Sequence, residues 1–71
     1  MCLNELEVGK TAFVKDICAR GIVKRRMLDL GIIPGTKIKA LMESPSGELT
    51  AYLIRGTVIA IRQNDAKNIS I

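Results

Sequence analysis

The sequence predicts a mainly β domain, folded as a small and partly open β-barrel with one short helix. Apolar and polar residues alternate in about five short runs, which is typical of half-buried strands. Glycine and proline separate these runs at short intervals, which favours hairpin connections. A meander of so few strands leaves exposed edges unless it curls into a barrel. Residues 1–71 are expected to form a single domain, without room for a deep cleft.

The first part of the chain is expected to supply a lead-in and one strand. Residues 3–9 form the lead-in, and residues 11–18 the strand. The apolar anchors of the lead-in are Leu3, Leu6 and Val8. Ile17 falls out of phase with the earlier apolar positions, which indicates a β-bulge near Lys15-Asp16. Cys18 ends the strand and is expected to be a small core residue.

One helix is predicted over residues 22–30. Val23, Met27 and Leu30 fall on one narrow stripe when successive residues are placed about 100° apart. The start of the helix lacks a Ser, Thr, Asp or Asn that could cap it. Gly21 is therefore the best N-cap available, although it is a weaker one.

The residues after the helix predict an abrupt stop and a tight turn. Gly31 can adopt the left-handed conformation that ends a helix, and a Schellman motif would then place Ile32 in apolar contact with the last turn. Residues 33–36 suit a type II turn, because Pro34 fixes φ at the second position and Gly35 supplies a positive φ at the third.

Two strands joined by a hairpin follow. Residues 36–43 alternate well, and residues 48–54 form the next strand, with a turn between them that contains Gly47. One face of the first strand carries Ile38, Ala40 and Met42, with Leu41 as an exception on the polar face. One side of the second strand carries Leu49, Ala51 and Leu53.

The rest of the chain predicts a second hairpin and a closing strand. Arg55 and Gly56 fit a tight two-residue connection to a short apolar strand at residues 57–61. Residues 62–66 are polar and predict one helical turn before the last strand, at residues 68–71.

The charge distribution points to an acidic partner. The net charge is +4, but residues 10–39 alone hold eight basic and two acidic side chains. Such an excess of positive charge favours an acidic binding partner, which could be a protein surface, a nucleic acid or an anionic membrane face. No apolar run reaches the roughly 18 residues of a membrane helix, and the N-terminus has no signal-peptide pattern. A cytoplasmic location without direct membrane insertion is therefore expected, with any position at the inner face of the membrane reached through a partner. Cys2 and Cys18 are expected as reduced thiols in preference to a disulfide.

Catalysis and strong metal binding are both disfavoured. The chain has no histidine, so no serine can be activated by an imidazole and the commonest nitrogen ligand for iron is absent. Asp16, Glu43 and Glu48 are scattered, which leaves only weak surface binding of a transition metal as an alternative. We therefore expect no enzyme activity, no cofactor and no dedicated metal site.

A partner-binding surface is the more plausible functional site. Leu28 lies away from the apolar stripe, between Lys24 and Arg25 on the helical wheel. An exposed apolar residue among arginines is typical of an interface hot spot, although a loop could instead cover it. Tyr52, opposite the leucines of its strand, could play the same part on the sheet. The candidate contact residues are Lys24, Arg25, Arg26, Leu28, Tyr52 and Arg55.

These motifs together resemble those of the ferrous iron transport protein A family, known as FeoA. The specific part is the run Arg25-Arg26-Met27-Leu28-Asp29-Leu30-Gly31-Ile32 with Pro34-Gly35-Thr36. Weaker matches are Leu3-Asn4-Glu5-Leu6 with Gly9, Ser44-Pro45 with Gly47, and Gly56 with Ala60-Ile61-Arg62, Ala66 and Ile69. The resemblance implies an SH3-like five-stranded barrel. It also implies a cytoplasmic accessory protein that acts on FeoB, a membrane Fe²⁺ transporter with a GTP-binding domain.

Three alternatives stay open at this point. The basic residues would also suit a small barrel that binds nucleic acid, although such proteins use more aromatic stacking than this chain offers. An iron-sensing module, like the SH3-like C-terminal domains of iron-dependent repressors, would need metal ligands. Arg25 or Arg26, or Arg20 and Arg55 in loops, could also be supplied in trans to a GTPase, but simple pairing with acidic partner residues is the plainer interpretation. The sequence leaves the oligomeric state undecided.

Overall fold

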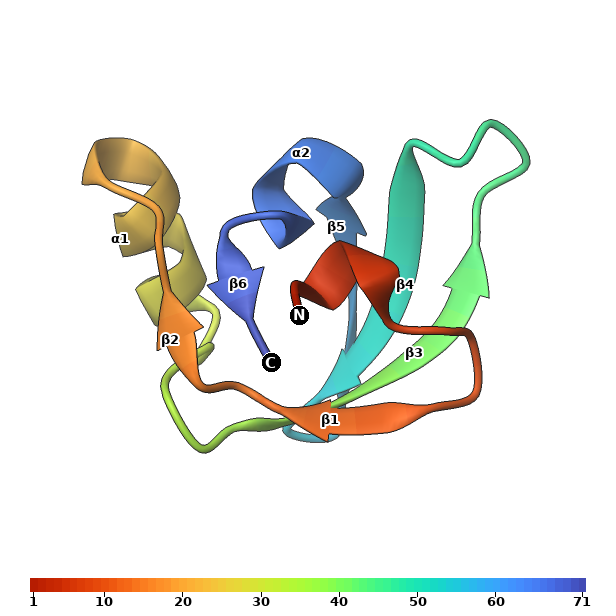
Figure 1. The fold of residues 1–71 in the computed structure, drawn as a ribbon, viewed down its shortest axis with the longest axis horizontal. Coiled ribbons are helices and arrows are strands. Elements are labelled where there is room, and N and C mark those ends of the chain that lie inside the picture. The colour runs from red at the N-terminus through yellow and green to blue at the C-terminus, as the bar shows by residue number, and fades with distance from the viewer.

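The computed structural model describes residues 1–71 as two antiparallel sheets and three short helical segments (Figure 1). The larger sheet has the strand order β1-β3-β4-β5. Its strands are β1 (Thr11–Phe13), β3 (Lys37–Glu43), β4 (Leu49–Ile54) and β5 (Thr57–Arg62). The smaller sheet pairs β2 (Asp16–Ile17) with β6 (Ile69–Ser70). The two sheets do not close into one barrel, and the structure has six strands where the sequence predicts about five.

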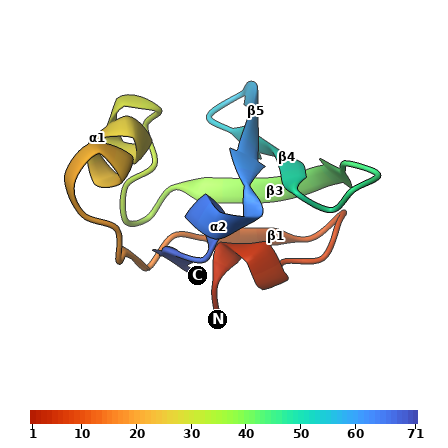
Figure 2. The ribbon, with the colours of Figure 1, turned by 90° about the horizontal axis from the view of Figure 1, so that it is seen from above.

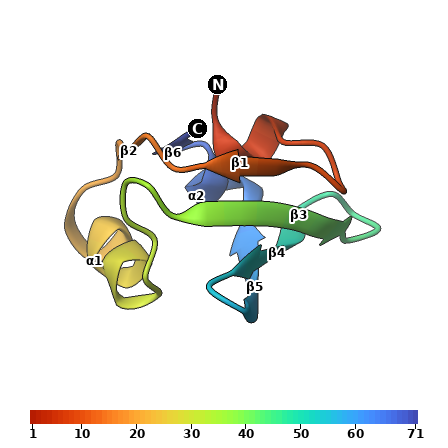
Figure 3. The same ribbon diagram turned by 90° about the horizontal axis from the view of Figure 1, so that it is seen from below.

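The helical segments occupy two places in this arrangement. They are the 3₁₀ helix η1 (Leu3–Glu5), α1 (Gly21–Asp29) and α2 (Gln63–Ala66). Figure 1 shows η1, α2 and both chain termini within the curve of the larger sheet. Figures 2 and 3 show α1 at one end of the molecule, beside the start of β3. The helical turn predicted before the last strand is therefore present as α2.

The core is almost entirely aliphatic and draws on nearly every element. A cluster of 14 buried hydrophobic residues joins the two sheets to η1, α1 and α2. Its largest fully buried side chains are Tyr52, Leu3, Ile32, Ile38, Ile54 and Ile69. The helix α1 contributes only Met27 as a buried residue, so most of its surface stays available.

The predicted first strand is two strands in different sheets, and a β-bulge is not the cause of the phase slip. Val14, the residue after β1, still hydrogen-bonds to the turn before β3, because its N–H donates to the Thr36 carbonyl at 2.9 Å. The next residue, Lys15, donates instead to the Ser70 carbonyl at 2.7 Å. Ile17 is out of phase because the chain changes sheets between these two residues.

The buried face of β4 is the opposite of the one that its leucines indicate. Thr50, Tyr52 and Ile54 are buried, whereas Leu49 and Leu53 are exposed. The ring of Tyr52 fills the core, and its hydroxyl donates to the carbonyl of Leu3 at 3.4 Å. The prediction that Tyr52 is a surface contact is therefore wrong, because only 1% of this residue is exposed.

A bulge in β3 moves Met42 out of the predicted apolar face. The pairing with β4 shifts register between Ala40 and Met42. The residue between them, Leu41, is half-buried, whereas Met42 is exposed. The bulge therefore explains why Leu41 falls on the polar face in a strict alternation.

Three other residues expected in the interior lie at the surface. Cys18 is exposed, because Ile17 points into the core and successive strand residues point in opposite directions. Val8 and Leu30 are also exposed, although Leu30 belongs to the predicted stripe of α1. Both cysteines are free thiols in the structure.

The start of α1 differs from the prediction by one residue. Gly21 is the first helical residue, and Arg20 is the N-cap, with extended backbone and no side-chain capping hydrogen bond. The start of the helix is therefore not held by a polar side chain.

The end of α1 has both hydrogen bonds of the predicted Schellman motif. The N–H of Gly31 donates to the Leu28 carbonyl and that of Ile32 to the Met27 carbonyl, each at 2.9 Å. Gly31 has a φ of +84°, and Ile32 is fully buried. The type II turn follows, since the N–H of Thr36 donates to the Ile33 carbonyl at 3.0 Å.

Both predicted hairpin turns are present as well. Between β3 and β4, the N–H of Gly47 donates to the Ser44 carbonyl at 2.9 Å. Between β4 and β5, Arg55 and Gly56 have φ values of +52° and +78°, as a type I′ turn requires. The Arg55 side chain lies against Gly31, because a Cβ at that glycine would be 3.2 Å from the Arg55 Cδ.

Replacing Gly31 should destabilise the protein more than replacing Gly35. Both glycines have a positive φ, which costs about 1–2 kcal/mol for an L-residue, but an alanine Cβ meets Arg55 only at position 31. We expect the Gly31→Ala variant to have the lower free energy of unfolding in urea. The additional destabilisation of Gly31→Ala over Gly35→Ala should be smaller when Arg55 is also replaced by alanine. Equal decreases in the free energy of unfolding for the two glycine variants would contradict this account.

The stability of the protein should depend on Tyr52 at alkaline pH. Burial raises the pKa of the Tyr52 hydroxyl, and the charge of Glu43 adds to the increase. The stabilisation that the protonated Tyr52 gives the folded protein is therefore complete below the pKa of about 10 that tyrosine has in the unfolded chain. It is lost as the pH rises through the higher pKa of Tyr52 in the folded protein.

The Tyr52→Phe variant separates this effect from the titration of the lysines. At pH 7 it should lose about 0.5–1.5 kcal/mol, for the hydrogen bond to Leu3. Above about pH 10 its free energy of unfolding should fall less steeply than that of the parent protein. Urea unfolding followed by far-ultraviolet circular dichroism measures both values, and parallel declines would show that Tyr52 does not titrate differently on folding.

Candidate functional site

The outward face of α1 is a basic surface with an apolar centre. Lys24, Arg25 and Leu28 lie within about 100° of one another around the helix axis, and all three are exposed. Leu28 is 45% exposed, so no loop covers it. The structure therefore presents a leucine beside two cations at the surface, and we call these three residues the outward face.

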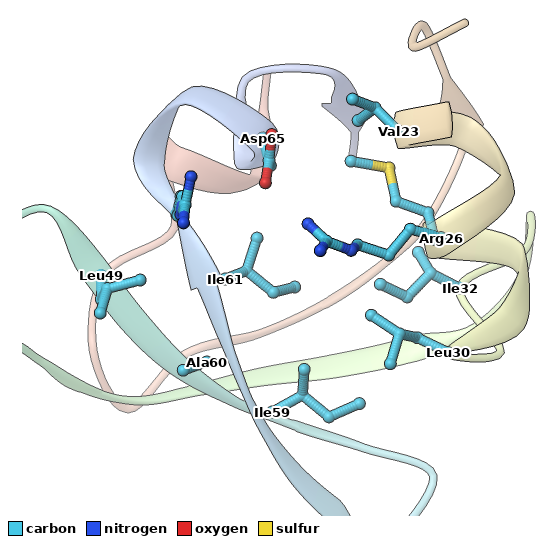
Figure 4. A pocket seen from close by; sticks show the side chains of 11 residues that line it. Val23, Arg26, Leu30, Ile32, Leu49, Ile59, Ala60, Ile61 and Asp65 are labelled. Atoms are coloured by element: carbon cyan, nitrogen blue, oxygen red, sulfur yellow. The ribbon is translucent and has the colours of Figure 1, made fainter. Parts of the chain in front are cut away.

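Arg26 lies on a different side of α1 from its neighbour Arg25. It lines a groove of about 330 Å³ between α1 and β5, and Figure 4 shows its side chain reaching into that groove toward Ile61 and Asp65. The groove is lined by Val23, Arg26, Met27, Leu30, Ile32, Leu49, Ile59, Ala60, Ile61, Arg62 and Asp65. The candidate arginines therefore belong to two separate surfaces.

Arg55 lies next to the C-terminal end of α1, although it is 26 positions beyond Asp29, the last residue of the helix. Its contact with Gly31 places a positive charge close to the carbonyl end of the helix, where the helix dipole favours cations. Arg55 also lines a hollow in the sheet together with Lys37 and Lys39. It thus extends the basic surface from the end of α1 to the sheet.

The cationic side chains of these surfaces have no hydrogen-bond partner within the chain. The side-chain hydrogen bonds of the structure are made by Glu5, Asp16, Thr36, Ser44, Ser46, Thr50, Tyr52, Gln63 and Asn68. The lysines and arginines can therefore pair with an external acidic group without first breaking an internal bond.

The acidic and thiol groups do not gather into a metal centre. No group of three or more His, Cys, Asp or Glu side chains lies close enough to hold a metal ion. None of the helices has the length and apolar character needed to span a bilayer.

Sequence reasoning missed the groove, although part of its signal was present. The stripe of Val23, Met27 and Leu30 correctly marks the side of α1 that faces the sheet. Only Met27 is buried, because α1 stands beside β5 and leaves a gap that Arg26 partly fills. No pattern within one element could reveal this separation between two elements.

Known proteins share both the sequence and the fold of this chain. A family model described as "FeoA domain" matches residues 1–71. The chain is 28% identical over 71 residues to the Fe(2+) transport protein A/Fe(2+) transporter FeoB fusion protein of Porphyromonas gingivalis. The match covers 100% of this chain but only 8% of the fusion protein.

Two solved structures support the assignment. The solution structure of the FeoA protein from Chlorobium tepidum is 36% identical, with a TM-score of 0.91, covering 99% of this chain and 67% of that one. The zinc-complexed FeoA of Stenotrophomonas maltophilia, described as a procaryotic SH3 domain protein, is 27% identical. Its TM-score is 0.87, with 99% of this chain and 87% of that one covered.

These matches confirm the predicted mainly β, SH3-like fold, with the qualification that its two sheets do not close. The family match extends over the whole chain and includes the run from Arg25 to Thr36 on which the sequence resemblance rests. The chain belongs to the FeoA family.

Proposed function

We propose that this chain is a non-enzymatic accessory domain of ferrous iron uptake that binds the cytoplasmic part of a FeoB-type transporter. The observation that carries the proposal is the outward face of α1, with an exposed Leu28 between two unpaired cations. The fusion of the two proteins in Porphyromonas gingivalis supports it, because joining two domains in one chain raises their effective concentration.

The outward face has the chemistry of a protein contact. Leu28 supplies an apolar anchor that loses its remaining water contact on binding, and Arg25 can form a bidentate pair with a carboxylate. Lys24 beside them adds a rim charge, which affects the association rate more than the affinity. Arg55 at the end of α1 extends the same charge, so the expected partner surface is acidic with an apolar pocket.

The proposed contact places the chain at the cytoplasmic side of the membrane through its partner. The GTP-binding region of the transporter is the partner surface we favour. Binding there would modulate iron uptake without any chemistry by this chain, which needs no cofactor or metal for the contact.

Two substitutions on the outward face test the proposal. Arg25→Glu should weaken binding to the purified GTP-binding domain about tenfold, and Leu28→Asp by roughly 10–100-fold. Isothermal titration calorimetry, with the domain in its GTP-analogue and GDP states, measures both changes. The free energy of unfolding should change by about 0.5 kcal/mol or less for Arg25→Glu, whose position is exposed. Leu28→Asp should cost about 1–2 kcal/mol, because Leu28 is partly covered and the new carboxylate lies in the last turn of α1, so binding is measured well below the urea midpoint of each variant.

Two control variants match these changes elsewhere on the surface. Met42→Asp alters an apolar residue that is 65% exposed and lies near the end of β3, at the opposite end of the molecule from α1 (Figure 1). Lys67→Glu makes the same charge change as Arg25→Glu at the end of α2. If the controls weaken binding as much as the test variants do, α1 does not present the specific contact that we propose.

A further inference from the structure

The outer side of the larger sheet is a second surface, on the side away from the core. Side chains of residues paired across neighbouring strands share one face of a sheet. One row of pairs crosses all four strands and comprises Thr11, Lys39, Leu53 and Val58. The next row contains the pair of Phe13 and Lys37. In Figure 3, β3 lies in front of α2 with no helix over it.

The charges of this outer face are all positive. Lys37, Lys39 and Arg55 border one hollow of about 350 Å³, which is completed by Thr11, Leu53 and Gly56. None of the residues that line the hollow is acidic. An anionic group placed there would meet three cations and no repelling carboxylate within the lining.

Exposed apolar side chains flank the same hollow. Phe13 is 60% exposed and is paired with Lys37, whereas Val58 is 61% exposed and is paired with Leu53. These side chains would contribute little to the binding of a small soluble anion. A single-stranded nucleic acid would need several aromatic rings for stacking, and Phe13 is the only one on this face.

Cations combined with exposed apolar side chains suit the surface of an anionic bilayer. Lysine and arginine attract the phosphates of acidic lipids, while aromatic and aliphatic side chains enter the boundary between headgroups and acyl chains. We propose that the outer sheet face binds anionic phospholipids through Lys37, Lys39 and Arg55, with Phe13 and Val58 in the headgroup boundary. This contact goes beyond the proposed binding to the transporter. It is centred on a surface other than the outward face of α1, and Arg55 lies at the border between the two surfaces.

The strength of the contact follows from the number of cations. Each basic residue near an anionic bilayer strengthens binding about fivefold, so three of them give a weak and reversible attachment. The lipid contact would orient the chain at the membrane. Binding would weaken at higher salt, because salt shortens the range of the electrostatic attraction.

A vesicle-binding assay tests the inference directly. The full chain is sedimented with vesicles of phosphatidylcholine and phosphatidylglycerol in equal parts, and separately with phosphatidylcholine alone. We expect binding only to the anionic vesicles, with a loss of most binding between about 0.05 and 0.5 M salt. The double variant Lys37→Glu/Lys39→Glu should lower the partition coefficient at least about 25-fold.

A charge-matched control distinguishes binding through the outer sheet face from general electrostatic attraction between a basic protein and an anionic vesicle. Lys24→Glu/Arg25→Glu makes the same change in net charge on α1 and should alter vesicle binding less than about threefold. Phe13→Ser leaves the charge unchanged and should still lower binding three- to tenfold. The folding of every variant is checked by its urea midpoint, and all of these positions are exposed.

Several outcomes would overturn the inference. One is an absence of binding to anionic vesicles at low salt, and another is an equal loss in the two charge variants, which would indicate general attraction. Tighter binding of a labelled oligonucleotide on the same face would show that the ligand of this face is a nucleic acid and not a lipid. Transporter binding is a separate readout, because the Lys37→Glu/Lys39→Glu variant should retain its affinity for the GTP-binding domain.

Discussion

The connection between the end of α1 and β3 is the constraint on which the rest of the surface depends. Gly31 ends the helix in the left-handed conformation, and the buried hydroxyl of Thr36 donates to the Gly31 carbonyl at 3.2 Å. The same hydroxyl accepts from the N–H of Ile33, also at 3.2 Å. One side chain at the start of β3 thus satisfies two groups in the segment that leaves the helix. Together with the packing of Met27 and Val23 against the core, this connection holds α1 in its orientation.

The orientation of α1 decides what each of its basic residues can do. It turns Arg26 toward the groove beside β5 and leaves Arg25 in solvent, although the two are neighbours in the sequence. It also brings Arg55, from a distant hairpin, against Gly31. The protein thereby has a basic helix face and a basic sheet face, which fits a small domain that meets a protein and a membrane at once. Neither face requires catalytic chemistry.

The sequence predicts the turns well but the faces of the strands only in part. Ile38 and Ala40 of β3 are buried as predicted, whereas the buried face of β4 is reversed. The turn at Gly31 depends mainly on the φ values that its own residues can adopt, so a local pattern is sufficient. The face of β4 depends on its partners: Leu49 and Leu53 alternate on one side, but Tyr52 fills the core from the other. Cys18 is exposed for a similar reason, since the chain changes sheets before it. The sequence nominates Arg55 as a contact residue together with those of α1, but its position beside Gly31 depends on the fold and could not be predicted.

The central claim is that the outward face of α1 is the contact with the transporter. Amide chemical shifts of the isotope-labelled chain, followed during titration with the GTP-binding domain in each nucleotide state, test it most directly. The account predicts that the perturbed amides cluster from Lys24 to Gly31 and at Arg55, while those of β6 and α2 stay unchanged. Perturbations centred away from α1, or none with the domain in excess, would contradict it.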